Sequence, residues 1–215
     1  MPNVMMKTPA PMLRKITAAA MLLLALFACS PSPPPFKATD ITGSAIASGF
    51  DLPDNMGGGF ELPDHNGKPR QFNEFRGKLV IVTFGFTSCP DVCPTTLQTL
   101  AETVKQLGPD ADAVQVIMIT VDPARDTQEL MSQYTSAFNP RFIGLVPSEE
   151  ALKQVAEQFK VFYVRNEPRR RGYYTVDHTA ASYVFDRRGR ARLYVPHEMS
   201  IADRISDLRR LLNER

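Results

Sequence analysis

Two short apolar runs constrain how this chain of 215 residues can fold. The segments KLVIVTFGF (78–86) and AVQVIMITV (113–121) are rich in β-branched residues and carry almost no charge. Uninterrupted runs of this kind are typical of strands that are covered on both faces, as in α/β proteins. Between them, residues 95–107 have the apolar spacing of a helix. The apolar positions of this segment are Leu97, Leu100, Val104 and Leu107. The order strand, helix, strand predicts an α/β core.

The remaining segments extend this pattern. The turn sequence DHNG (64–67) predicts an N-terminal β-hairpin within residues 60–75. Further helices are expected at 127–138, from Ser148 to about 160, and at 201–212, and further strands at 142–146, 161–164, 181–186 and 191–195. We therefore predict an α/β, thioredoxin-like fold with an N-terminal β-hairpin and an inserted loop or hairpin around 165–176.

The first 28 residues have the composition of a secretory signal. Three basic residues precede an apolar run, 16–28, that is shorter than the roughly 20 residues needed to span a bilayer. The segment LFAC (26–29) resembles a bacterial lipobox, in which the cysteine is acylated and becomes the mature N-terminus. Plain secretion, with an unmodified thiol at Cys29, is the alternative.

These signals divide the chain into three parts. Residues 1–28 are expected to be a lipoprotein signal peptide, residues 29–55 a flexible Pro/Gly/Ser-rich membrane tether, and residues 56–215 the folded domain. The domain should then lie in the bacterial cell envelope, facing the periplasm or the exterior, with lipid on Cys29 as its membrane anchor. The leader holds three of the 25 Lys and Arg and none of the 23 Asp and Glu, which leaves a net charge of −1, so we expect no nucleic-acid partner.

Cys89 and Cys93 lie where the first apolar run gives way to the helical segment. The N-terminal end of a helix favours the thiolate form of cysteine, and Pro94 suits a first helical turn. In a helical turn, residues i and i+4 share a face, so the two sulfurs can converge. A local disulfide is one interpretation, but closing so short a loop would contribute only about 2 kcal/mol.

A redox pair and a metal site are the stronger interpretations. Thioredoxin-like redox enzymes place two residues between their cysteines and a cis-proline before a later strand, whereas this chain has three residues and the sequence Asp177-His178-Thr179. Two thiolates and the imidazole of His178 would form a soft three-ligand set suited to Cu(I) and able to hold Cu(II). Zinc also accepts such ligands, but a structural zinc site requires a fourth. We predict one copper at Cys89, Cys93 and His178, with a redox-active Cys89–Cys93 disulfide as the alternative state.

Three motifs resemble the Sco/SenC family of copper proteins, which assist assembly of cytochrome c oxidase. They are GKLVIVTFGFTSCPDVCPTTL (77–97), ITVDPARDT (119–127) and YTVDHTAASYVFDRRGR (174–190). The resemblance covers about residues 55–213. It implies a thioredoxin-like fold, copper ligation by Cys89, Cys93 and His178, and transfer of copper or electrons to the dinuclear copper centre of oxidase subunit II.

We therefore expect a copper metallochaperone rather than an enzyme. A thiol-disulfide oxidoreductase that keeps the copper-site cysteines of the oxidase reduced is the alternative. The chaperone needs a copper donor, and both functions need a thiol reductant in the same compartment. A thiol peroxidase is disfavoured because the motif Pro-x-x-x-Thr-x-x-Cys does not precede either Cys89 or Cys93.

For acidic residues near the predicted ligands, the sequence indicates a role in the site less strongly than for the ligands themselves. Asp91 and Asp177 adjoin the ligands and are expected either to orient His178 or to serve as ordinary turn residues. Asp126 or Thr127 is expected to cap the helix that follows DPARDT, in a segment that supports the site without binding metal.

Basic residues also precede His178 in the sequence. Arg169, Arg170 and Arg171 crowd a segment that leads toward the predicted site. We expect them to dock an acidic face of the copper acceptor by electrostatic steering, with a solvated loop as the alternative. His65 and His197 are expected to lie in surface turns.

Overall fold

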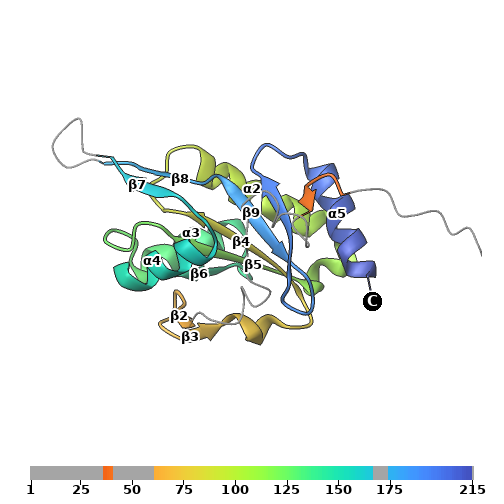
Figure 1. Ribbon diagram of the computed structural model, residues 1–215, viewed down its shortest axis with the longest axis horizontal. Helices are drawn as coiled ribbons and strands as arrows, with labels where there is room; N and C mark the ends of the chain where they lie inside the picture. The colour runs from red at the N-terminus through yellow and green to blue at the C-terminus, as the bar shows by residue number, and fades with distance from the viewer. Residues whose placement is uncertain (1–35, 41–60, 167–173, 215) are drawn as a thin grey trace, which may run out of the picture. The chain divides into compact units, whose positions relative to one another are not determined.

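The computed structural model describes residues 36–40, 61–166 and 174–214, which belong to a compact unit that begins at Phe36 (Figure 1). Its centre is a six-stranded sheet with the strand order β1-β10-β9-β4-β5-β6. These strands are β1 (Thr39–Asp40), β4 (Leu79–Gly85), β5 (Val114–Thr120), β6 (Ile143–Leu145), β9 (Ala181–Phe185) and β10 (Ala191–Pro196). Strand β4 is parallel to β5 and antiparallel to β9, so the sheet is mixed. This arrangement confirms the predicted thioredoxin-like α/β fold.

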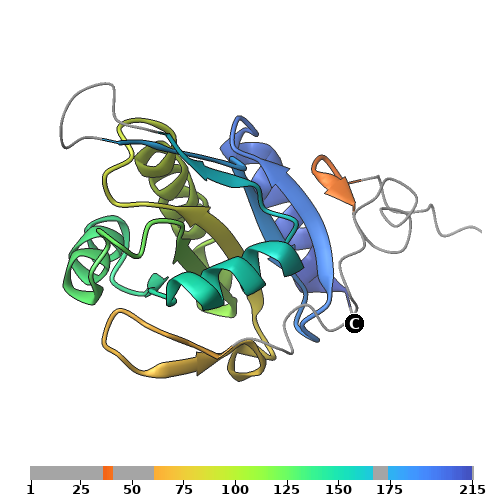
Figure 2. The same cartoon turned by 60° about the vertical axis from the view of Figure 1, so that its left-hand side comes forward.

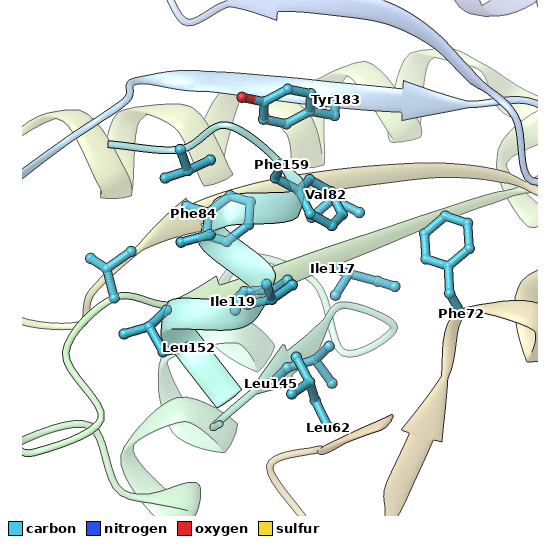
Figure 3. Close-up of a cluster of buried hydrophobic side chains, with 14 of the residues drawn as sticks. Leu62, Phe72, Val82, Phe84, Ile117, Ile119, Leu145, Leu152, Phe159 and Tyr183 are labelled. Carbon is cyan, nitrogen blue, oxygen red and sulfur yellow. The ribbon is translucent and has the colours of Figure 1, made fainter. Parts of the chain in front are cut away.

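Helices cover both faces of the central strands, which is why the apolar runs are continuous. The helices are α2 (Val92–Gln106), α3 (Gln128–Phe138), α4 (Glu149–Gln158) and α5 (Ile201–Asn213), with the 3-10 helices η3 (Phe72–Phe75) and η4 (Gly108–Ala113). On one face of β4, Leu79 and Ile81 pack with apolar residues of α2, α3 and α5. On the other face, Val82 and Phe84 pack with α4 and with the N-terminal hairpin (Figure 3). Every residue of β4 is buried as a result.

Side-chain caps fix where three of these helices begin. Thr127, Ser148 and Ser200 each accept a hydrogen bond from a backbone N–H of the first helical turn. The sequence predicted a cap from either Asp126 or Thr127, and the cap is Thr127. Helix α2 begins at Val92, earlier than the predicted residue 95, so Cys93 lies within its first turn.

Two hairpins lie outside the six-stranded sheet; the first was predicted as a hairpin and the second as an inserted loop or hairpin. Strands β2 (Glu61–Pro63) and β3 (Pro69–Gln71) form the N-terminal hairpin. Strands β7 (Tyr163–Arg165) and β8 (Val176–His178) form the inserted hairpin, which is visible beside α2 in Figures 1 and 2. His65, which was expected in a solvated turn, instead accepts a hydrogen bond at Nδ1 from the N–H of Gly144 and is half-buried, because the first hairpin packs onto β6.

Strand β1 corrects one sequence-based assignment. Thr39 and Asp40 pair with Tyr194 and Leu193 of β10, within the range predicted as tether. The N–H groups of Lys37 and Ala38 donate to the buried carboxylate of Asp207 on α5, at 2.7–3.0 Å. Residues 36–40 are therefore part of the folded domain. Among the described residues, no helix is long and apolar enough to cross a bilayer.

Candidate metal centre

Three potential metal ligands converge beyond the carboxyl end of β4. Cys89 lies in the turn after this strand, and its N–H donates to the carbonyl of Phe86. Cys93 lies one helical turn later, and its N–H points at the Sγ atom of Cys89 at 3.4 Å. His178 ends β8, and its Nε2 atom lies 3.4 Å from Sγ of Cys93. The ligand atoms of Cys89, Cys93 and His178 all lie within 4.8 Å of one another.

The hydrogen bond of the second ring nitrogen orients His178. Its Nδ1 atom lies 3.1 Å from the carbonyl oxygen of Thr179. With the proton on Nδ1 donated to this carbonyl, Nε2 keeps its lone pair and faces Cys93. Thr179 is itself fixed, because its N–H donates to the carbonyl of Phe162 and its hydroxyl accepts from the N–H of Phe162. The β7–β8 hairpin thus presents the Nε2 atom of His178 to the two sulfurs.

The two cysteines differ in burial and in their affinity for protons. Cys89 is half-buried, whereas Cys93 is only 4% exposed. The hydrogen bond from the Cys93 thiol lowers the pKa of Cys89 to about 3 against the opposing effect of burial. The same hydrogen bond to Cys89, together with burial, raises the pKa of Cys93. Cys89 is therefore the thiolate of the pair, and Cys93 holds the shared proton.

Gly85 makes room for Cys93. A Cβ atom at position 85 would lie 3.0 Å from Sγ of Cys93 and 3.0 Å from Cε of Met118. Such approaches are shorter than van der Waals contact, so a larger residue would displace one neighbour or the other. Sequence reasoning missed this residue, although a glycine inside an apolar strand is a signal for close approach.

The loop between β5 and α3, residues 121–127, contacts the turn that carries Cys89. The carboxylate of Asp126 is fully buried and accepts hydrogen bonds from three donors. These are the N–H and hydroxyl of Thr87, at 3.0 and 2.6 Å, and the hydroxyl of Thr120, at 2.5 Å. Because Thr87 lies two residues before Cys89, Asp126 anchors the chain that carries the first sulfur.

The same loop also holds the hairpin that carries His178. The buried carboxylate of Asp122 accepts a 2.7 Å hydrogen bond from the hydroxyl of Tyr174 and pairs with Arg125. The guanidinium of Arg125 lies 3.6 Å from the ring centroid of Tyr174, and it donates a 3.0 Å hydrogen bond to the backbone carbonyl of Tyr174. The loop 121–127 therefore contacts both parts of the candidate site. We call Asp122, Arg125 and Tyr174 the hairpin clamp.

The other predicted site residues place no side chain in the three-ligand cluster or lie outside the described residues. Asp91 precedes α2 and is exposed, and Asp177 is exposed on β8, so the proposed orientation of His178 by either carboxylate stays a prediction. His197 lies in a turn and pairs with Glu198. The lipidation site Cys29 and the arginines at 169–171 lie outside the described residues.

The donor set determines which metals fit. Two sulfurs and one imidazole nitrogen suit a soft ion such as Cu(I), and the set can also hold Cu(II). Within residues 36–40, 61–166 and 174–214, no second cluster of three Cys, His or acidic side chains converges in this way. The chemistry of the site thus agrees with the predicted copper ligands.

Comparisons with known proteins identify the family. A family model described as SCO1/SenC matches residues 50–213. A SCO2-like protein of Rickettsia prowazekii is 41% identical over 143 residues, which are 66% of this chain and 68% of that protein. The structure of Bradyrhizobium japonicum ScoI with copper bound is 38% identical, with a TM-score of 0.66, and the match covers 72% of this chain and 98% of that chain. Yeast Sco1 with copper bound is 28% identical, with a TM-score of 0.67, covering 74% and 89%. From its sequence and its fold, this chain belongs to the SCO1/SenC family.

Proposed function

We propose that this protein is a copper metallochaperone, anchored in the bacterial cell envelope by lipid on Cys29, that delivers copper to the dinuclear centre of cytochrome c oxidase subunit II. The observation that supports this most directly is the convergence of Cys89, Cys93 and His178. Copper is bound in the solved structures of Bradyrhizobium japonicum ScoI and yeast Sco1. The acceptor is inferred from the part that the Sco/SenC family takes in oxidase assembly.

In this proposal, the asymmetry of the two cysteines sets the order of loading. The half-buried Cys89 is already a thiolate and faces solvent, so it meets the incoming copper first. Cys93 then ligates and releases the proton that the pair had shared, because thiolate and not thiol binds metal. Nε2 of His178 completes the set.

Release follows from the same asymmetry. A thiolate of the acceptor can approach from the exposed side and displace Cys89, while Cys93 and His178 still hold the copper. A second acceptor ligand then replaces these two, so ligands are exchanged in steps and no free ion is released. A membrane anchor would raise the effective concentration of the site near a membrane-bound acceptor.

A thiol-disulfide oxidoreductase is the second candidate, and the lowered pKa of Cys89 favours it. The Cys89 thiolate would attack a disulfide of the oxidase and form a mixed disulfide, releasing one target thiolate. Cys93 would then displace the second target thiol and form the Cys89–Cys93 disulfide. A thiol reductant must restore the pair, and copper loading needs the same reductant.

One set of variants tests the proposal and separates the two functions. Anaerobic titration with Cu(I) and Cu(II), in a Cys29→Ser background where Cys89 and Cys93 are the remaining thiols, should give one copper per chain. His178→Ala should weaken copper binding at least tenfold and abolish transfer to the purified copper domain of subunit II. The matched control His197→Ala should leave both unchanged.

Disulfide reduction by Cys89 and Cys93 should not require His178, so His178→Ala should affect copper transfer and disulfide reduction differently. If His178→Ala transferred no copper but still reduced the oxidised acceptor at the wild-type rate, the two activities would be separate properties of one site. If His178→Ala supported oxidase assembly as well as wild type does, the chaperone function would be wrong and the oxidoreductase function would replace it.

A further inference from the structure

A group of basic side chains lies at the end of the sheet away from the metal centre. Because β4 and β9 are antiparallel, the cysteine turn after β4 and the β9–β10 turn lie at opposite ends of the sheet (Figure 1). We call this group the arginine face. It consists of Arg187, Arg188 and Arg190 in the β9–β10 turn, Arg210 on α5, and Arg76 and Lys78 before β4, and the buried Arg192 of β10 adjoins them.

Contacts between these segments make the face continuous. The N–H of Gly77 donates to the carbonyl of Arg187 at 2.8 Å, which brings Arg76 and Lys78 beside the turn. A surface pocket extends from the turn to the end of α5. It is lined by Asp186, Arg187, Arg188, Arg190, Arg192, Leu211 and Glu214.

The face carries more positive charge than its carboxylates neutralise. Asp186 pairs with Arg190 at 2.6 Å, and Glu214 pairs with Arg192. Arg187 and Arg188 are exposed, and among the described residues neither side chain pairs with a carboxylate. Because the chain without its leader has a net charge of −1, this excess is local.

The chain enters the folded domain at the same face. The ring of Phe36 lies 3.7 Å from the guanidinium of Arg210 and 5.7 Å from that of Arg192. The hydrogen bonds from Lys37 and Ala38 to Asp207 fix this entry point. Cys29 precedes Phe36 by seven residues, and seven residues span at most about 25 Å when fully extended.

We propose that the arginine face lies against the membrane and binds the anionic headgroups of phospholipids. This inference rests on the anchoring part of the proposed function. If lipid on Cys29 holds the chain at the bilayer, Phe36 lies within about 25 Å of the membrane, and the arginine face is the part of the domain beside it. Guanidinium groups bind phosphate oxygens in a fork geometry, and basic side chains near an anionic bilayer are attracted to it. The domain would then point the metal centre away from the membrane.

Arginine footprinting on the full-length protein tests this orientation directly. The protein is placed in phosphatidylcholine nanodiscs with and without phosphatidylglycerol, and modification of each arginine by 2,3-butanedione is followed by mass spectrometry. Arg187 and Arg188 should react about fivefold more slowly with phosphatidylglycerol, which corresponds to the attraction of one basic side chain to an anionic surface. High salt should remove the difference, and Arg165, which is exposed on the β7–β8 hairpin beside the metal centre, should react equally in both.

A matched pair of variants shows whether charge at the face is the cause. Arg187→Gln with Arg188→Gln should remove the lipid-dependent protection of Arg190, whereas Lys68→Gln with Lys153→Gln, which changes the charge equally elsewhere, should retain it. Equal reaction of Arg187 and Arg188 in both nanodiscs, or protection that does not depend on anionic lipid, would overturn the inference.

The mass of the protein in the same sample shows whether Cys29 carries lipid, which distinguishes failure of the membrane orientation from failure of the lipid anchor. Lipid on Cys29 with unprotected arginines would overturn the orientation and leave the anchor in place. Protected arginines without lipid on Cys29 would support the face as a lipid-binding surface and overturn the anchor. An unlipidated chain with unprotected arginines would overturn both.

Discussion

The Nε2 atom of His178 lies 3.4 Å from the Sγ atom of Cys93, although the two residues are 85 positions apart in the chain. The cysteine comes from the first turn of α2, and the histidine comes from the end of the inserted hairpin. The loop 121–127 contacts both segments, so it sets the separation between the sulfurs and the imidazole.

The unequal pKa values of the two cysteines predict unequal alkylation of the apo protein. Because the pKa of Cys89 is lowered to about 3, its thiolate persists through neutral pH, and its reaction with iodoacetamide should stay near its plateau from pH 8 down to pH 5. Cys93, whose pKa is raised, should react slowly throughout. Mass spectrometry of the labelled peptides in a Cys29→Ser chain measures both rates. A tenfold fall in the Cys89 rate per pH unit below pH 8 would contradict the prediction.

Gly85→Ala should weaken copper binding without unfolding the domain. The added Cβ would lie 3.0 Å from Sγ of Cys93, and the overpacking should cost about 1–3 kcal/mol, part of it as displacement of the sulfur. Copper titration and thermal unfolding measure the two effects. Gly144→Ala is the matched control, because its Cβ would meet Met131 and Thr135 instead. If both variants bound copper as tightly as wild type, Gly85 would have no part in placing Cys93.

Tyr174→Phe should loosen the hairpin clamp and shift His178. The change removes the hydrogen bond to Asp122, worth about 0.5–1.5 kcal/mol, but keeps the ring beside Arg125. Tyr174→Ala removes both contacts and should have the larger effect on copper affinity. In NMR spectra of the apo protein, the ring resonances of His178 should shift from their wild-type positions more in Tyr174→Ala than in Tyr174→Phe.

Tyr134→Phe is the control for the clamp, because the buried hydroxyl of Tyr134 has no hydrogen-bond partner among the described residues. This variant should leave copper affinity and the His178 resonances unchanged. Wild-type values in Tyr174→Ala would mean that the clamp does not position the histidine.

Asp126→Asn should destabilise the fold, because the buried carboxylate accepts from three donors. An amide offers one acceptor oxygen, and its NH₂ group would face a donor, so we expect a loss of about 1–3 kcal/mol in the free energy of unfolding. Urea denaturation measures it, with the exposed Asp110→Asn as control. Equal unfolding midpoints for the two variants would count against the anchoring role of Asp126.

The arginines at 169–171 are expected to affect copper transfer but not copper affinity. Replacing Arg169, Arg170 and Arg171 with Ser should slow transfer to the acceptor at low ionic strength and have no effect at high ionic strength, because salt screens electrostatic steering. Stopped-flow transfer kinetics give both rates. A variant with Ser at Lys68, Arg141 and Lys153 is the matched control. Equal rates for all proteins at low salt would make this segment an ordinary solvated surface.

The sequence by itself determined the central secondary-structure elements of the fold and the residue types of the candidate metal site. The apolar runs at 78–86 and 113–121 became β4 and β5, because a strand covered on both faces must be apolar throughout. The helix starts at Ser148 and at Asp126 or Thr127 were also predicted, because a cap acts on its own first turn, and the caps are Ser148 and Thr127. Cys89, Cys93 and His178 were chosen from residue type, spacing and family resemblance, which need no coordinates.

The tertiary structure alone decided how distant segments meet. The docking of residues 36–40 depends on the carboxylate of Asp207, which lies about 170 positions away. The use of Asp126 as a buried anchor for Thr87, and of His65 as a partner of Gly144, likewise has no local signal. Local periodicity reports whether a side chain is buried, but its partner across the core depends on how the elements pack. For this reason the sequence predicted which side chains form the candidate metal centre but not the loop that holds them together.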